Sequence, residues 1–97
     1  MRHFHRTHLR PAEALAVADE FFPTRGLTTA ASTRDSRTFS GELGVTTIRA
    51  WPEGGHYTFI EAVTDKPGES RIDRNVKRYF VKVHRAAEPR HQLKAAY

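Results

Sequence analysis

The sequence predicts an α+β fold, an antiparallel sheet with one face covered by helices. An apolar pattern of helical spacing follows a short extended segment at the N-terminus, and the middle of the chain is rich in Thr, Val, Ile and aromatic residues broken by Gly, Asp and Ser. A strongly amphipathic helical pattern follows near the C-terminus. The chain has 97 residues, 38% of them hydrophobic, which is enough for one core but not for two.

The first predicted elements are a strand and a helix. Residues 2–9 are expected to be extended, and Pro11 suits the first turn of a helix because its missing N–H would have no partner there. Apolar residues then recur at helical spacing, namely Leu15, Ala18, Phe21 and Phe22. Pro23 is expected to end this helix, since proline disfavours helical geometry in the residue before it.

Antiparallel strands joined by short turns are predicted for the middle of the chain. Four strands are expected, over residues 27–33, 37–43, 45–51 and 56–64. The clearest hairpin signal is the turn at residues 52–55, which contains two consecutive glycines. Gly41 lies either in a turn or in a β-bulge within a strand, and the sequence leaves both open.

A second helix is expected from Glu69 to about Ala87. Its apolar residues recur at spacings of four, four and three, namely Ile72, Val76, Phe80 and Val83, with Tyr79 at the border of the same stripe. This helix is expected to pack on the sheet and to end before Pro89. Residues 1–89 would then form a single α+β domain, and residues 90–97 a short flexible tail.

The predicted order of elements is strand, helix, four-strand meander and C-terminal helix. This order resembles that of the TATA-binding-protein-like and helix-grip folds. Because one fold hosts many unrelated functions, the resemblance implies an architecture and nothing about activity.

Basic residues form a stripe along the second helix. They are Arg71, Arg74, Arg78, Lys82 and Arg85, whose spacing places them on one side of the helix and which we call the basic stripe. The chain carries 16 Lys and Arg against 11 Asp and Glu, and this net charge of +5 favours nucleic acid or an acidic protein surface as a partner. We therefore expect a small binding module that contacts nucleic acid or another polyanion through the basic stripe. The alternative is that the stripe is an ordinary solvated helix face.

A second hypothesis is a small-ligand-binding or enzymatic domain with a pocket between the sheet and the helices. Its lining would come from Trp51, Tyr57, Phe59 and Glu61, where a carboxylate among apolar neighbours resembles the setting of general acids and bases. The chain has no cysteine, which excludes thiolate nucleophiles, and it has no Gly-rich phosphate or dinucleotide motif. A non-enzymatic module without a cofactor is therefore the leading expectation.

Three histidines lie among the first eight residues and raise the question of a metal site. On an extended strand His3 and His5 share one face while His8 points to the other, so one strand cannot direct all three at one ion. Arg2 and Arg6 would also repel a dication. No bound metal is expected.

Partners and location follow from general features of the chain. No stretch approaches the roughly twenty apolar residues of a membrane span, so we expect no membrane partner and a cytoplasmic location. An open five-stranded sheet leaves two unpaired edges, which proteins cover, charge or pair with a second copy. Self-association into a homo-oligomer such as a dimer is therefore expected as well.

Overall fold

The computed structural model describes residues 1–88, so the tail expected at residues 90–97 lies outside the described residues. The fold is α+β, as predicted, with a five-stranded antiparallel sheet and two α-helices. The elements in chain order are β1 (Arg2–Thr7), α1 (Pro11–Phe21), the short 3₁₀ helix η1 (Phe22–Arg25), β2 (Thr28–Ser32), β3 (Ser36–Gly41), β4 (Gly44–Glu53), β5 (Tyr57–Thr64) and α2 (Arg71–Ala87). None of the helices within residues 1–88 is long and apolar enough to cross a membrane.

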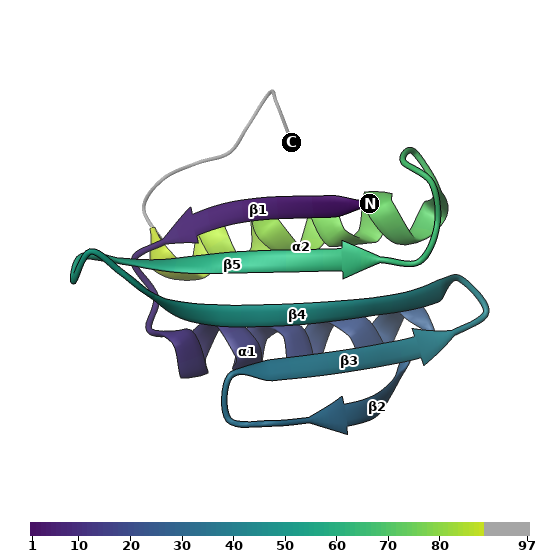
Figure 1. Cartoon of the computed structure of the whole chain (residues 1–97), viewed down its shortest axis with the longest axis horizontal. Coiled ribbons are helices and arrows are strands. Elements are labelled where there is room, and N and C mark those ends of the chain that lie inside the picture. Colours follow the sequence, from purple (N-terminus) through teal and green to yellow (C-terminus); the bar gives the residue numbers. More distant parts are fainter. Residues whose placement is uncertain (89–97) are drawn as a thin grey trace.

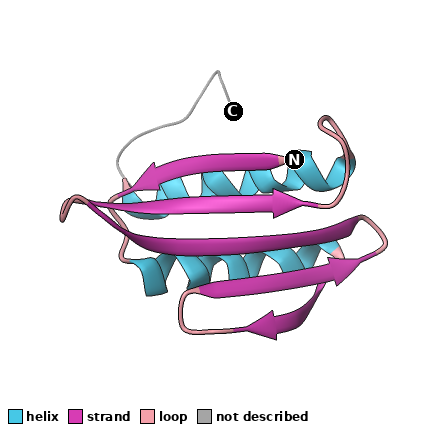
Figure 2. Cartoon of the chain, viewed as in Figure 1, coloured by secondary structure: helices cyan, strands magenta, loops and turns pink. Residues whose placement is uncertain are grey.

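The strands lie in the order β1-β5-β4-β3-β2, so the N-terminal strand β1 pairs with the last strand of the four-strand meander, β5. All neighbouring strands are antiparallel, and β1 and β2 form the two edges. Both helices lie behind the sheet in Figure 1, and Figure 2, in the same view, colours the strands in front magenta and the helices behind them cyan. The other face of the sheet carries no helix within the described residues.

Alternation along the strands decides which side chains meet the helices. On β5 the residues Thr58, Ile60, Ala62 and Thr64 are buried, whereas the residues between them are exposed or half-buried. The buried set faces the helices and packs with the apolar side of α1 and α2. The core therefore lies between the sheet and the helices.

On α2 the aromatic side chain in the core is that of Tyr79 and not, as expected, that of Phe80. Tyr79 is fully buried together with Ile72, Val76 and Val83, whereas Phe80 is only partly buried and packs at the margin of the core. The Tyr79 hydroxyl donates a hydrogen bond to the carbonyl oxygen of Ala14 at 2.8 Å, which links α2 to α1. The prediction that Phe80 is buried against the sheet is therefore wrong.

Helix α2 begins two residues later than expected. Glu69 has a φ of 71°, which excludes it from the helix, and Ser70 is the N-cap residue, whose hydroxyl accepts from the backbone N–H of Asp73. Pro23 does not end the first helical segment at once, because the chain continues as η1 up to Gly26, whose φ of 81° ends the turn. Gly41 ends β3 opposite Gly44, and the register shift lies in β2.

Candidate nucleic-acid interface

All five residues of the basic stripe are exposed on α2. The apolar side of the same helix is buried against the sheet and α1. Because the basic residues lie on the opposite side of the helix, they point to solvent. The structure therefore brings the sequence-predicted cations onto one accessible side of the molecule. This placement makes the stripe available to a partner without any rearrangement of the core.

The basic stripe has no carboxylate partner among the described residues. Arg74 Nη2 donates to the backbone carbonyl oxygen of Glu69 at 3.2 Å, but the Glu69 carboxylate lies 3.6 Å from the ammonium of Lys77, outside the stripe. The ion pairs found in residues 1–88 involve other cations. The positive charge of the stripe is therefore not neutralised within this part of the chain.

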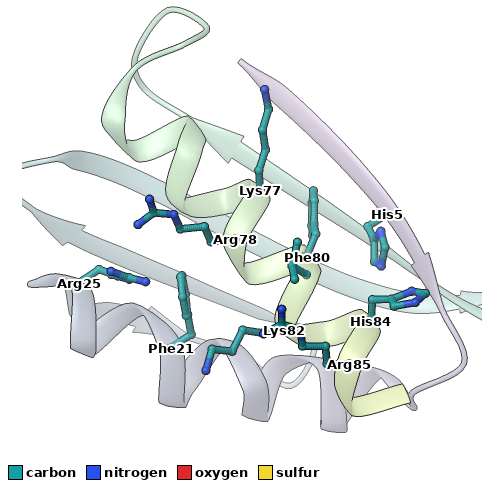
Figure 3. Close-up of a pocket in the computed structure, with 10 residues that line it drawn as sticks. His5, Phe21, Arg25, Lys77, Arg78, Phe80, Lys82, His84 and Arg85 are labelled. Carbon is teal, nitrogen blue, oxygen red and sulfur yellow. The ribbon is translucent and has the colours of Figure 1, made fainter. Parts of the chain in front are cut away.

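The C-terminal half of the stripe borders an open hollow of about 650 Å³. Its lining includes Arg78, Lys82 and Arg85 from α2 together with Phe21 and Arg25. Figure 3 shows these basic side chains around α2, with Arg25 and Phe21 on the neighbouring segment. The hollow combines apolar surface with several cations, and no carboxylate lines it among the residues described.

The N-terminal half of the stripe borders a smaller hollow of about 320 Å³. It is lined by Thr24, Arg25, Leu43, Arg71, Arg74, Asn75 and Arg78. Four of these residues are arginines, and none is acidic. Arg25 and Arg78 line both hollows, so the two hollows share a border and form one basic surface.

Arg25 is the member of this surface that sequence reasoning missed. It lies in η1, and its guanidinium carbon is 5.1 Å from the centre of the Phe21 ring, which holds the side chain over the end of α1. Its approach to α2 depends on how the two helices pack, since Arg25 and Arg71 are far apart in sequence. No local pattern predicts that proximity.

The N-terminal histidines do not converge on one point. His3 Nε2 lies 2.7 Å from Asp73 Oδ1, whereas His5 stacks on Phe80 with ring centres 5.0 Å apart. His8 lies beyond the end of β1 and contacts Tyr57, whose ring centre is 5.0 Å away. Within residues 1–88 no three His, Asp or Glu side chains form a group that could hold a metal ion.

His5 lies in an electrostatically unfavourable place for a cation. Burial lowers the pKa of His5, and electrostatic repulsion between the imidazoles of His5 and His84 lowers it further. Its Nε2 is buried and has no hydrogen-bond partner among the described residues. His5 is therefore held mainly as a neutral ring against Phe80.

The residues predicted to line an internal pocket lie on the face of the sheet without helices. Tyr57, Phe59 and Glu61 alternate with the buried residues of β5, and Trp51 pairs with Phe59 across the β4–β5 ladder. The sheet itself separates them from α1 and α2, and packed apolar side chains fill the space on the helix side. Their predicted location between sheet and helices is therefore wrong, although the structure does bring them together.

Phe4, Trp51 and Phe59 form an aromatic cluster on the open face. The Phe59 ring centre is 5.3 Å from that of Phe4 and 5.2 Å from that of Trp51. Phe4 is 53% exposed and Trp51 37% exposed, so the cluster is accessible. Glu61 lies beside it and pairs with the exposed Arg2, whose Nη1 is 3.8 Å from Glu61 Oε2.

Comparison of the chain with models of protein families, with curated proteins and with solved structures found no match in any of the three.

Proposed function

We propose that this protein is a nucleic-acid-binding module that uses the basic stripe of α2 together with Arg25. One observation carries the proposal. The exposed cations of α2 and η1 line two adjoining hollows to which the described chain contributes no carboxylate. Clustered cations without internal partners repel one another, and an anionic partner relieves that repulsion.

The geometry suits a phosphate backbone better than an isolated anion. From Arg71 to Arg85 the helix rises by roughly 20 Å at 1.5 Å per residue, so the cations are distributed along a line. Such a line can contact several phosphates in succession. Few groups on this surface could read base edges, since Asn75 is the one side-chain amide on α2 and it is buried. Binding is therefore expected to have little sequence preference.

Binding of the stripe can be tested by fluorescence anisotropy with a labelled single-stranded oligonucleotide. The variant Arg74→Ala/Arg78→Ala is expected to weaken binding strongly, because it removes two neighbouring cations. The matched control is Arg34→Ala/Arg49→Ala, which removes the same charge from exposed positions in a turn and on β4, away from the basic surface. Equal weakening by both variants would show that net charge matters but the stripe does not.

A second surface supports self-association, which we propose as a separate property of the module. The aromatic cluster of the open face is accessible, and two of the arginines on this face are paired with carboxylates, since Arg6 Nε lies 2.6 Å from Glu53 Oε1 and Arg2 pairs with Glu61. A face with aromatic rings and both signs of charge can match a two-fold-related copy of itself.

Sedimentation equilibrium tests the self-association directly. The natural chain is expected to form a dimer, and Phe4→Gln/Trp51→Gln should shift it to the monomer by removing exposed apolar contacts. The control Ala16→Gln changes an exposed position on α1 and should leave the dimer intact. A monomeric natural chain at high concentration would contradict the proposal.

A further inference from the structure

We infer that the smaller hollow binds the terminal phosphate monoester of a nucleic-acid strand. This inference rests on the proposed function, because it assigns a particular group of the same ligand to one part of the basic surface. The hollow lies where η1 approaches the N-terminal half of α2, and its volume of about 320 Å³ falls at the lower end of the range of small-ligand sites.

The charge in the hollow exceeds what one internal phosphate requires. Arg25, Arg71, Arg74 and Arg78 all line it, and no acidic residue of the described chain does so. An internal phosphodiester carries a single negative charge, whereas a terminal monoester carries about −1.5 to −2 near neutral pH. The monoester therefore offsets the grouped guanidinium charge better than any internal position of the same strand.

The guanidinium group also suits the shape of a monoester. Arginine presents a planar fork of N–H donors that can bind two oxygens of one phosphate. A monoester exposes three terminal oxygens, and a diester exposes only two. Arg25 and Arg78 extend into the space between η1 and α2 from opposite sides (Figure 3), so they can approach one phosphate from two directions.

Asn75 lines the smaller hollow beside these arginines. Its side chain is 8% exposed, and its Nδ2 donates to the backbone carbonyl oxygen of Arg71 at 2.9 Å. That bond fixes the orientation of the amide and leaves the buried Oδ1 without a hydrogen-bond partner among the described residues. A buried acceptor without a donor is unfavourable. A sugar hydroxyl beside the phosphate is the kind of donor that this acceptor lacks, and it would reach the buried Oδ1 after a small shift of the amide, whereas base edges stay out of reach.

The remaining cations of the stripe indicate where the rest of the strand would lie. Lys82 and Arg85 border the larger hollow, which adjoins the smaller one at Arg25 and Arg78. A strand whose terminal phosphate occupies the smaller hollow can continue along α2 toward these residues. The partly buried Phe80 also lines the larger hollow, and its apolar surface is suited to contact with a base.

The test is competition for a labelled strand by three unlabelled strands of identical sequence. One carries a phosphate at its 5′ end, one carries a phosphate at its 3′ end, and one ends in hydroxyl groups at both ends. At least one phosphorylated strand is expected to compete about tenfold better than the hydroxyl strand, which corresponds to about 1.4 kcal/mol. Equal competition by all three would overturn the terminal-phosphate inference and leave the proposed function standing. Failure of every strand to bind would overturn both.

Two matched variants locate the effect. Arg25→Gln/Arg71→Gln removes two cations that line the smaller hollow and is expected to abolish the preference for a phosphorylated end. Lys82→Gln/Arg85→Gln removes the same charge from α2 outside that hollow. It should weaken the binding of all three strands equally, so that the preference for a phosphorylated end persists. Circular dichroism should show that both variants are folded. A preference that survives Arg25→Gln/Arg71→Gln would overturn the assignment to this hollow.

Displacement of the labelled strand by inorganic phosphate distinguishes a site for a strand end from a site for any small anion. A nucleoside monophosphate is expected to displace the labelled strand at lower concentration than inorganic phosphate, because the nucleoside adds contacts beyond the phosphate. If inorganic phosphate displaces the strand equally well, the hollow is a simple anion site and the inference is wrong.

Discussion

The imidazole of His3 lies against the carboxylate of Asp73, with Nε2 and Oδ1 2.7 Å apart, and this contact links the edge strand β1 to the first turn of α2. Asp73 is almost fully buried and also accepts hydrogen bonds from the hydroxyls of Thr64 and Ser70. Burial alone would raise the pKa of Asp73, but the hydrogen bonds from Ser70, His3 and Thr64 outweigh burial and hold that pKa below its usual value. The Asp73 carboxylate thus connects the first strand, β1, to the last helix, α2.

We predict that Asp73→Ala lowers the free energy of unfolding by about 1.5–3 kcal/mol, because three hydrogen-bonded groups lose a charged acceptor. Urea unfolding at neutral pH measures this loss. The folded pKa of Asp73 lies below its unfolded value of about 3.9, so its contribution is complete above that pH and is lost as the pH falls through the folded pKa. A variant as stable as the natural chain would show that this network is not stabilising.

The packing of α2 gives a second prediction. Tyr79→Ala is expected to cost about 3–5 kcal/mol, because it removes a fully buried ring, and Phe80→Ala is expected to cost less, since Phe80 is only partly buried. Tyr79→Phe isolates the hydrogen bond to Ala14 and should cost about 1 kcal/mol. Thermal or urea unfolding of the three variants gives the order. A larger loss for Phe80→Ala than for Tyr79→Ala would reverse the assignment of the core face.

The lowered pKa of His5 gives a prediction about how the free energy of unfolding depends on pH. Its folded pKa is lowered, first by burial and then by His84, so the unfolded chain takes up a proton more readily. Stability from this residue is complete above the unfolded pKa of about 6.5 and is lost as the pH falls through the folded value. His5→Phe keeps a ring against Phe80 and removes the titration, so its stability should fall less between about pH 7 and pH 5. His56→Gln, at an exposed turn, should retain the slope of the natural chain.

The absence of a resident metal remains a prediction. His3 is engaged by Asp73 and His5 by Phe80, so both rings already have partners on α2. Elemental analysis of protein purified without an affinity tag is expected to find no stoichiometric zinc, nickel or copper. Stoichiometric metal that is lost in His3→Ala/His5→Ala would contradict this expectation.

The spacing of apolar residues predicted the helices and strands well, because each element buries the residues of one face. The alternation of β5 and the apolar spacing of α2 both reflect contact with one core. Tyr79 and Phe80 show where periodicity fails: adjacent residues differ by only about 100° around a helix, so either can face the core. The choice depends on the partner helix, since the Tyr79 hydroxyl reaches a carbonyl group of α1.

The candidate site was predictable only in part, for the same reason. The basic stripe lies on one helix, and its spacing is visible in the sequence. Arg25 joins the stripe through tertiary packing, and the two hollows exist only where η1 meets α2. The location of Trp51, Tyr57, Phe59 and Glu61 was wrong because alternation identifies two faces of a strand but does not say which face the helices cover.

The salt dependence of nucleic-acid binding tests the central claim most directly. For single strands the slope of the logarithm of the binding constant against the logarithm of salt concentration is about −0.7 for each phosphate contact. The natural chain should therefore show a steep slope, and Arg74→Ala/Arg78→Ala should flatten it by about 1.4, while Arg34→Ala/Arg49→Ala should leave it unchanged. Affinity no better than millimolar at low salt, or an unchanged slope in Arg74→Ala/Arg78→Ala, would show that the basic stripe is an ordinary solvated helix face.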